Sequence, residues 1–306
     1  PEPNACPSKT GTPLASNDPT ATTEDTVTNA VDVPTKHVTV GDVSYAYREL
    51  RPAHLADPTP VLFLHRFRGT LDDWDPAFVD ELAKTRHVIL FSDAAVGSST
   101  GTPAKDFDEK GRNAAAFARA LGHTQIDVLG FSMGGFVCQT IALQEPQLVR
   151  KVIGVGTGPA GNAETAPPTD IVFGIALKDT YAFEDVRYLF FAEGREKETQ
   201  GFIDRMGLRK DREPVVGPEI IGKMVEAVGG FMGGQTDHYA RLKQLKQPFL
   251  IVSGDRDPFF PLKNTWLLFR ELANAQVAVY PLAGHGPHQQ HPVEVAAEIE
   301  RLLATT

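Results

Sequence analysis

The sequence predicts an α/β fold in which a mostly parallel sheet is covered by helices on both faces. Short apolar runs of strand length alternate with segments of helical periodicity. Most of these runs are continuously apolar, which indicates strands buried on both faces. One run is followed at once by Gly130-Phe131-Ser132-Met133-Gly134 and then by a helical segment, so a sharp strand–turn–helix connection is expected there.

The elements follow in order along the chain. Alternating runs at 36–40 and 43–47 flank Gly41-Asp42 and predict an antiparallel hairpin at the start of the domain. Further strands are expected at the continuous apolar runs 61–64, 87–91, 125–129, 152–155, 249–252 and 277–280. Helices are expected at 111–121, 136–143, 264–272 and 293–303.

One long stretch lacks strand runs and predicts an inserted helical cap at residues 161–241, after the sixth strand. Its helices are expected at 171–177, 183–192, 198–206 and 218–228. The α/β core would then comprise residues 34–160 and 242–306. Residues 1–33 are rich in Thr, Pro, Ala and acidic side chains, and we interpret them as a flexible N-terminal extension.

Composition excludes several classes of protein. With 306 residues, 42% of them hydrophobic and 23% charged, the chain can bury one large core. A net charge of -9 and no basic cluster argue against nucleic acid as a partner. No apolar run is long enough to span a bilayer, so no membrane partner is expected.

Of the two cysteines, Cys138 is expected in the core. Composition does not decide the localisation of the protein or whether it forms a homodimer.

Ser132 is the candidate nucleophile. The flanking glycines allow the backbone to turn without a Cβ clash, so that the hydroxyl would stand above the sheet beside a helix N-terminus. A serine hydroxyl is a weak nucleophile at neutral pH, so the motif predicts a carboxylate and then a histidine later in the chain. This chemistry requires no metal and no organic cofactor.

Both partners occur after later strand runs, at the sheet edge where α/β proteins gather their sites. The loop after the run 249–252 contains two carboxylates, Asp255 and Asp257. The last run is followed by Gly284-His285-Gly286, and His285 is the candidate base because its glycine neighbours leave the backbone free to aim the ring. His288 and His291 are expected to be solvated or helix-entry residues.

The loop after the run 61–64 is the candidate for oxyanion binding. A tetrahedral intermediate needs two preplaced donors, and we expect these to be the backbone amides of Phe67 and Met133. Arg66 or Arg68 could anchor this loop through carbonyls or through nearby aspartates. Direct substrate contacts are expected from Arg66, Phe131 and Trp74.

On these motifs, the chain from about Val40 to Leu303 resembles the α/β-hydrolase superfamily, and within it a bacterial serine hydrolase, chloroperoxidase-like group. The segments that carry the likeness are 63–76, 96–101, 130–135, 155–159 and 284–286. The resemblance implies that Asp257, rather than Asp255, is the acid, and that Phe67 is the oxyanion residue. His65-Arg66 departs from the His-Gly of most members, and residues 93–98 depart from the Asp-x-x-Gly-x-Gly of many.

The activity expected from these residues is hydrolysis of a small, largely apolar ester or lactone through an acyl-enzyme. Aromatic residues in the predicted cap favour an apolar substrate. Cofactor-free haloperoxidase, perhydrolase or carbon–carbon bond hydrolase chemistry could use the same residues. A serine in place of aspartate at position 132 disfavours epoxide hydrolases and haloalkane dehalogenases. A non-catalytic binding protein is a further alternative, disfavoured because candidates for all members of the triad are present.

Overall fold

The computed structural model describes residues 29–305 and contains one sheet with eight strands in the order β1-β2-β4-β3-β5-β6-β7-β8. β2 pairs antiparallel with β1 and β4, and the remaining neighbours are parallel. The predicted hairpin and parallel sheet are therefore confirmed. The strands are β1 (Lys36–Val40), β2 (Val43–Leu50), β3 (Val61–Leu64), β4 (Val88–Phe91), β5 (Ile126–Phe131), β6 (Val149–Val155), β7 (Phe249–Gly254) and β8 (Ala275–Tyr280).

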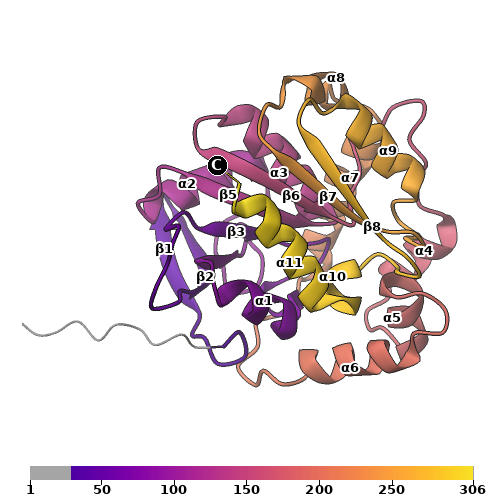
Figure 1. The fold of residues 1–306 in the computed structure, drawn as a ribbon, viewed down its shortest axis with the longest axis horizontal. Helices are drawn as coiled ribbons and strands as arrows, with labels where there is room; N and C mark the ends of the chain where they lie inside the picture. The colour runs from indigo at the N-terminus through magenta and orange to yellow at the C-terminus, as the bar shows by residue number, and fades with distance from the viewer. Residues whose placement is uncertain (1–28, 306) are drawn as a thin grey trace, which may run out of the picture.

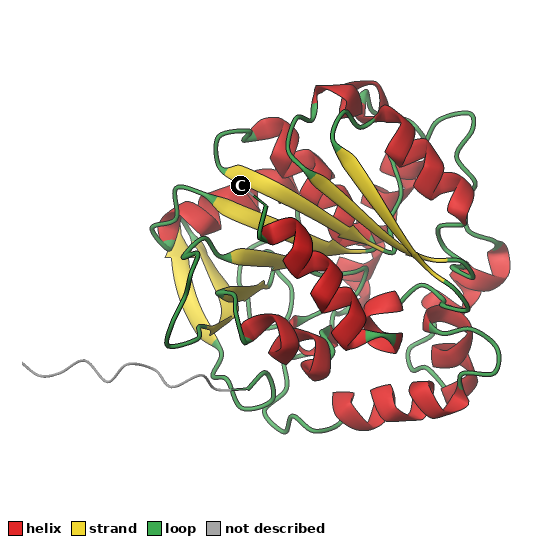
Figure 2. Ribbon diagram, in the orientation of Figure 1, coloured by secondary structure: helices red, strands yellow, loops and turns green. Residues whose placement is uncertain are grey.

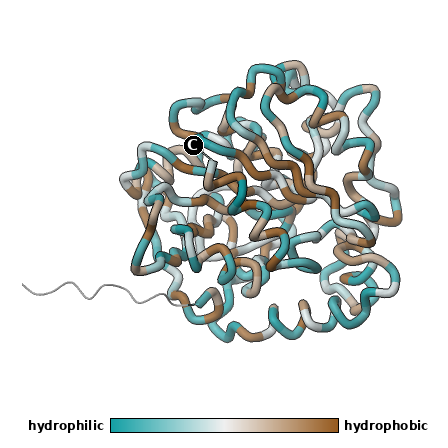
Figure 3. The backbone as a smooth tube through the Cα atoms, viewed as in Figure 1, coloured by the Kyte–Doolittle hydropathy of each residue, from teal (hydrophilic) through white to brown (hydrophobic). Residues whose placement is uncertain are grey.

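Helices cover both faces of this sheet, as the sequence predicts (Figures 1 and 2). One face carries α1 (Pro76–Ala83) and α11 (Pro292–Leu303), which pack against each other. The other carries α2 (Phe107–Ala120), α3 (Met133–Gln144) and α9 (Leu262–Glu271). The apolar colours of Figure 3 concentrate along the central strands, and β3, β4 and β5 are buried at every position.

Five helices lie between β6 and β7, and residues 156–248, all of them described, contain no strand. They are α4 (Asp170–Ala176), α5 (Phe183–Phe190), α6 (Glu196–Met206), α7 (Pro218–Met232) and α8 (His238–Arg241). The 3-10 helix Leu242–Gln244 follows α8 directly, and short elements elsewhere are the 3-10 helix Leu71–Asp73 and helix α10 (Pro287–Gln290). In Figure 1, α4, α5 and α6 gather at one end of the molecule, whereas α7 lies behind β7 and β8. That the segment 161–241 acts as a separate cap remains a prediction.

The predicted N-terminal extension lies mostly outside the described residues, but its last part is packed on the body. Val33 is only 1% exposed, and the Ala30 amide donates a hydrogen bond to Asp80. The Arg209 guanidinium donates to the carbonyls of Val31 and Val33 at 2.8 Å. Among the described residues, the packed body therefore begins before residue 34. The contacts that hold this part use backbone carbonyls and an arginine from the segment after α6, and amino-acid composition does not predict such contacts.

No helix in the part of the chain that the structure describes is both long and apolar enough to cross a membrane. Cys138 is a fully buried thiol on α3, as expected for a small core residue. Burial raises the pKa of this thiol well above its ordinary value, because a thiolate would be desolvated there. Cys6 lies outside the described residues.

Candidate active site

Ser132 lies on a strained turn between β5 and α3. Its φ of 56° and ψ of -117° are unusual for a residue with a side chain. Crowding around the turn explains its glycines: a Cβ at Gly134 would come within 1.8 Å of the Leu64 carbonyl oxygen, and one at Gly130 within 2.2 Å of the Gly134 carbonyl oxygen. The Ser132 amide donates to Val155 at 2.9 Å, which ties the turn to β6. The glycines therefore leave the room that this turn needs to place Ser132 at the end of β5.

His285 is joined to Asp257 by a hydrogen bond of 2.9 Å between Nδ1 and Oδ2. Both side chains are buried, and the other carboxylate oxygen accepts the amides of Phe259 and Phe260 at 2.8 and 3.0 Å. The His285 ring packs against Phe131, with 4.9 Å between ring centroids. The carboxylate is thereby held on both sides, and it orients the imidazole with Nδ1 facing the acid.

Asp255 has a different environment. Its side chain accepts the amide of Ala283 at 3.3 Å and lies 3.6 Å from the Arg256 guanidinium. It therefore joins the two loops that follow β7 and β8. Of the two carboxylates in the loop, only Asp257 contacts a histidine.

The Ser132 hydroxyl and His285 come from adjacent parts of the same sheet edge, but no hydrogen bond joins them among residues 29–305. A Cβ at Gly156, directly after β6, would come within 2.4 Å of the His285 carbonyl oxygen and 3.1 Å of its Nδ1, so the histidine packs tightly on the strand next to β5. Catalytic hydrogen bonds are often long in an empty site and shorten when substrate binds. The geometry is compatible with a base and nucleophile that meet in the complex.

Phe67 and Met133, the residues whose amides are expected to bind an oxyanion, both lie beside Ser132. Within the described residues, neither backbone N–H donates a hydrogen bond to a protein acceptor, and both residues border the same cavity as Ser132. Arg66 donates to the Phe67 carbonyl at 2.9 Å and pairs with Asp73, and Arg68 donates to the carbonyls of Ala176 and Lys178. Both arginines therefore brace the loop that presents the Phe67 amide.

The cavity at Ser132 has a volume of about 160 Å³, and no charged side chain is among the described residues that line it. Its walls come from α3, α4, α7 and the loop after Asp257, including Phe136, Phe173, Val225, Met232, Phe259 and Phe260. The residues from α7 and Phe136 were not predicted as site residues. The pair Phe259-Phe260, directly after the acid, was a signal that sequence analysis could have used.

Three predicted substrate contacts are absent from the described lining of this cavity. Phe131 and Trp74 are 1% and 4% exposed and pack together behind the His285 ring. The alternation of side chains along β5 sends Phe131 into the core on the face opposite α3. Arg66 turns toward Asp73, and its guanidinium lies 5.4 Å from the centre of the Phe190 ring.

His288 lies at a helix entry, one of the two positions expected from sequence, as the second residue of α10, and its side chain is not solvated. It is fully buried against Phe78, Trp74 and Phe131, and neither ring nitrogen has a hydrogen-bond partner among the described residues. Burial is the largest cause that lowers its pKa to about 3, with smaller electrostatic contributions from His285 and Arg66. His291 also lies at a helix entry, as the N-cap residue of α11.

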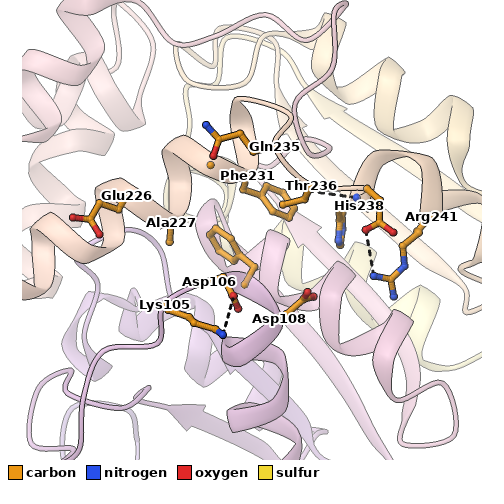
Figure 4. A pocket seen from close by; sticks show the side chains of 13 residues that line it. Lys105, Asp106, Asp108, Glu226, Ala227, Phe231, Gln235, Thr236, His238 and Arg241 are labelled. Atoms are coloured by element: carbon orange, nitrogen blue, oxygen red, sulfur yellow. Dashed lines mark hydrogen bonds and ion pairs between the residues drawn. The ribbon is translucent and has the colours of Figure 1, made fainter.

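A separate cavity of about 280 Å³ lies on the opposite side of α7 (Figure 4). It is bordered by Asp106, Asp108, Glu226, Gln235 and the buried His238, whose pKa burial lowers to about 4. Across residues 29–305, no group of three or more histidine, cysteine or acidic side chains is arranged to hold a metal ion. Figure 4 shows no serine or cysteine among the labelled side chains, so this cavity lacks the nucleophile present in the Ser132 cavity.

Comparison with known proteins agrees with this architecture. Residues 59–199 match the family model described as the alpha/beta hydrolase fold. A solved alpha/beta hydrolase fold protein from Chitinophaga pinensis superposes with a TM-score of 0.81 at 28% identity, covering 91% of this chain and 100% of that one.

Two curated relatives have named activities. A diacylglycerol lipase specific for the sn-1 position, from Mus musculus, is 22% identical over 80% of each chain. A 2-hydroxy-6-oxononadienedioate/2-hydroxy-6-oxononatrienedioate hydrolase from Cupriavidus pinatubonensis is 26% identical over 55% of this chain and 58% of its own length. The family match, the sheet order and the solved structure lead to one assignment: the chain has the alpha/beta hydrolase fold.

Proposed function

We propose that the protein is a serine esterase that cleaves esters with a small apolar acyl group through an acyl-enzyme. The observation that carries this proposal is the strained Ser132, which borders an apolar cavity together with two residues whose amides are free. A cavity of about 150 Å³ with aliphatic and aromatic walls can hold a molecule the size of benzene. The acyl group would be of that size.

In the proposed reaction, Ser132 Oγ attacks the ester carbonyl carbon while His285 takes the hydroxyl proton. The amides of Phe67 and Met133 would donate to the oxyanion that forms. The ester carbon–oxygen bond then breaks, and His285 returns the proton to the leaving alcohol. Asp257 stabilises the imidazolium through its hydrogen bond to Nδ1. Water attacks the acyl-enzyme by the same route and releases the acid.

The cavity favours an ester over the substrate of the carbon–carbon hydrolase relatives. The name of the Cupriavidus relative's substrate describes a dicarboxylate. A buried carboxylate needs a cationic or hydrogen-bonding partner, and the described walls of the Ser132 cavity offer no charged side chain. The two named relatives include a lipase, which is an ester hydrolase, and neither is named a lactonase. The proposal is therefore restricted to esters.

Covalent labelling tests the proposal directly. An organophosphonate ester should modify the protein stoichiometrically, and peptide mapping should locate the adduct on Ser132. Ser132→Ala should abolish both labelling and ester hydrolysis, and His285→Ala should label very slowly because the hydroxyl has lost its base. Ser98→Ala is the matched control, since the Ser98 hydroxyl donates to Glu213 and should not react. An adduct on another serine, or a folded protein that does not label, would refute the assignment.

A further inference from the structure

A larger cavity lies on the other side of the oxyanion loop. Its volume is about 510 Å³, compared with about 160 Å³ at Ser132. Its walls are mixed: charged and polar side chains, among them Arg66, Arg68, Thr180 and Arg212, lie beside apolar ones such as Val216 and Ile221. The site already described uses none of this space.

The same three segments line both cavities. In the loop 66–68, Phe67 borders the small cavity and its two neighbours border the large one. The segment 176–181 passes from the small cavity at its start to the large one at its end. On α7, Val225 borders the small cavity and Ile221, about 5.4 Å away along the helix, borders the large one. The two cavities are therefore neighbours on either side of these segments.

Some hydrogen-bonding groups in the wall of the large cavity do not form ion pairs. Two of its carboxylates already have cationic partners: Asp72 contacts Arg48 at 2.7 Å, and Asp73 pairs with Arg66. Arg212 differs, because its side chain is 47% exposed and its nearest carboxylate is 4.0 Å away. One of its N–H groups donates to the Met206 carbonyl at 2.7 Å, and its other donors can hydrogen-bond to the hydroxyl oxygens of a substrate.

We propose that the two cavities form one substrate site, with the acyl group in the small apolar cavity and a larger, hydroxyl-bearing alcohol in the large cavity, whose mixed walls include Arg212 and Thr180. This inference rests on the proposed esterase function. In the acyl-enzyme the acyl carbon is bonded to Ser132 Oγ, and the proposal places the acyl chain in the apolar cavity that Ser132 borders. The alcohol leaves with the proton from His285, and a polar alcohol is better accommodated by Arg212 and Thr180 than by the aromatic walls around Ser132.

Three butyrate esters test this inference. Methyl butyrate needs only the small cavity and reports whether the protein is an esterase. Glycerol 1-butyrate and pentyl butyrate have alcohols of equal size, and only the glycerol carries free hydroxyls. We expect kcat/KM for the glycerol ester to exceed that for the pentyl ester by about tenfold, the effect of one or two net hydrogen bonds.

Two variants locate the preference. Ile221→Trp should narrow the large cavity and lower the ratio of kcat/KM for glycerol butyrate to that for methyl butyrate by about tenfold. Arg212→Leu, at a half-exposed position, should reduce the preference for the glycerol ester over the pentyl ester. Lys223→Trp is the matched control, because this exposed α7 residue borders neither cavity and should leave both ratios unchanged.

The outcomes separate the two proposals. Hydrolysis of methyl butyrate without a preference for the glycerol ester would overturn the inference and leave the esterase proposal intact. A glycerol preference that persists in both Ile221→Trp and Arg212→Leu would also overturn it, because the alcohol would then bind elsewhere. Absence of hydrolysis of all three esters by a folded protein would overturn both.

Discussion

Two buried polar regions of this molecule differ in how their charged groups are paired. Around Asp257 and His285, one carboxylate faces a histidine, and an apolar cavity lies beside them. Around Arg48, Asp72 and Glu213, cations and carboxylates lie close together in a buried cluster. The comparison indicates that the first region keeps a reactive group available, whereas the second serves to join segments of the chain.

The second region, which we call the Arg48 cluster (Arg48, Asp72, Arg209 and Glu213), connects parts far apart in sequence. Arg48 on β2 lies 2.7 Å from Asp72, and the Glu213 amide donates to the same carboxylate at 2.6 Å. Arg209 lies 3.6 Å from Asp72 and also holds the residues before β1. The cluster thus fixes the segment after α6 on the α/β core with its charges compensated.

Replacing the acid of the first region should have the largest effect on activity. Asp257→Asn keeps the shape of the side chain but no longer stabilises an imidazolium, and kcat should fall by something on the order of 10⁴-fold. Asp255→Asn is the matched control and should cost far less, because Asp255 contacts the Ala283 amide and Arg256 rather than a histidine. Steady-state kinetics on methyl butyrate measure both. Equal losses, or a larger loss in Asp255→Asn, would contradict the assignment.

Breaking the Arg48 cluster should instead reduce stability. Arg48→Met leaves Asp72 buried without its nearest cation, and the free energy of unfolding should fall by about 3–5 kcal/mol. Arg301→Met, which removes an exposed pair with Glu298, should change it by no more than about 0.5 kcal/mol. Urea denaturation provides the measurement. A loss of activity in folded Arg48→Met as large as in Asp257→Asn would show that the two regions are not separate in function.

The first region could be predicted from sequence and the second could not. Strand runs directly precede Ser132, Asp257 and His285. Parallel strands end at the same edge of a sheet, so this proximity can be predicted without knowing how side chains pack. The strands and the long helices were predictable for the same reason, since each has a local periodicity. No local sequence pattern indicates that Arg48, Asp72 and Glu213 interact. Which of these charges meet depends on the loops and on the path of the chain between α6 and α7.

Burial that depends on tertiary packing was not predicted. His288 was expected either in solvent or at a helix entry; it lies at a helix entry, and the aromatic rings of Trp74, Phe78 and Phe131 enclose it. Helix α1 was not predicted although Asp75-Pro76 is a helix-start pattern, and it spans only eight residues. A polar residue in an otherwise apolar pocket has no signature in one sequence.

His288 also permits the finest comparison, with His285 three positions earlier. Both rings are buried, but only His285 has a carboxylate partner among the described residues. Replacing His288 with leucine removes a ring whose nitrogens make no hydrogen bond, so at neutral pH the free energy of unfolding should change by no more than about 1.5 kcal/mol. Methyl butyrate hydrolysis should respond far less than in Asp257→Asn.

The response of the His288→Leu variant to acid is the more specific test. The pKa of His288 is about 3 in the folded protein, below the value of about 6.5 expected in the unfolded chain. Between these values the unfolded chain binds a proton that folded His288 does not, so His288 makes the wild type lose stability as the pH falls through this window. Each pH unit should cost about 1.4 kcal/mol through this group, and His288→Leu should lose that part of the slope. Urea denaturation of both proteins at neutral and mildly acidic pH measures the difference. If the free energy of unfolding fell equally with pH in both proteins, folded His288 would bind a proton as readily as the unfolded chain does. Burial among aromatic rings would then not be what distinguishes His288 from His285.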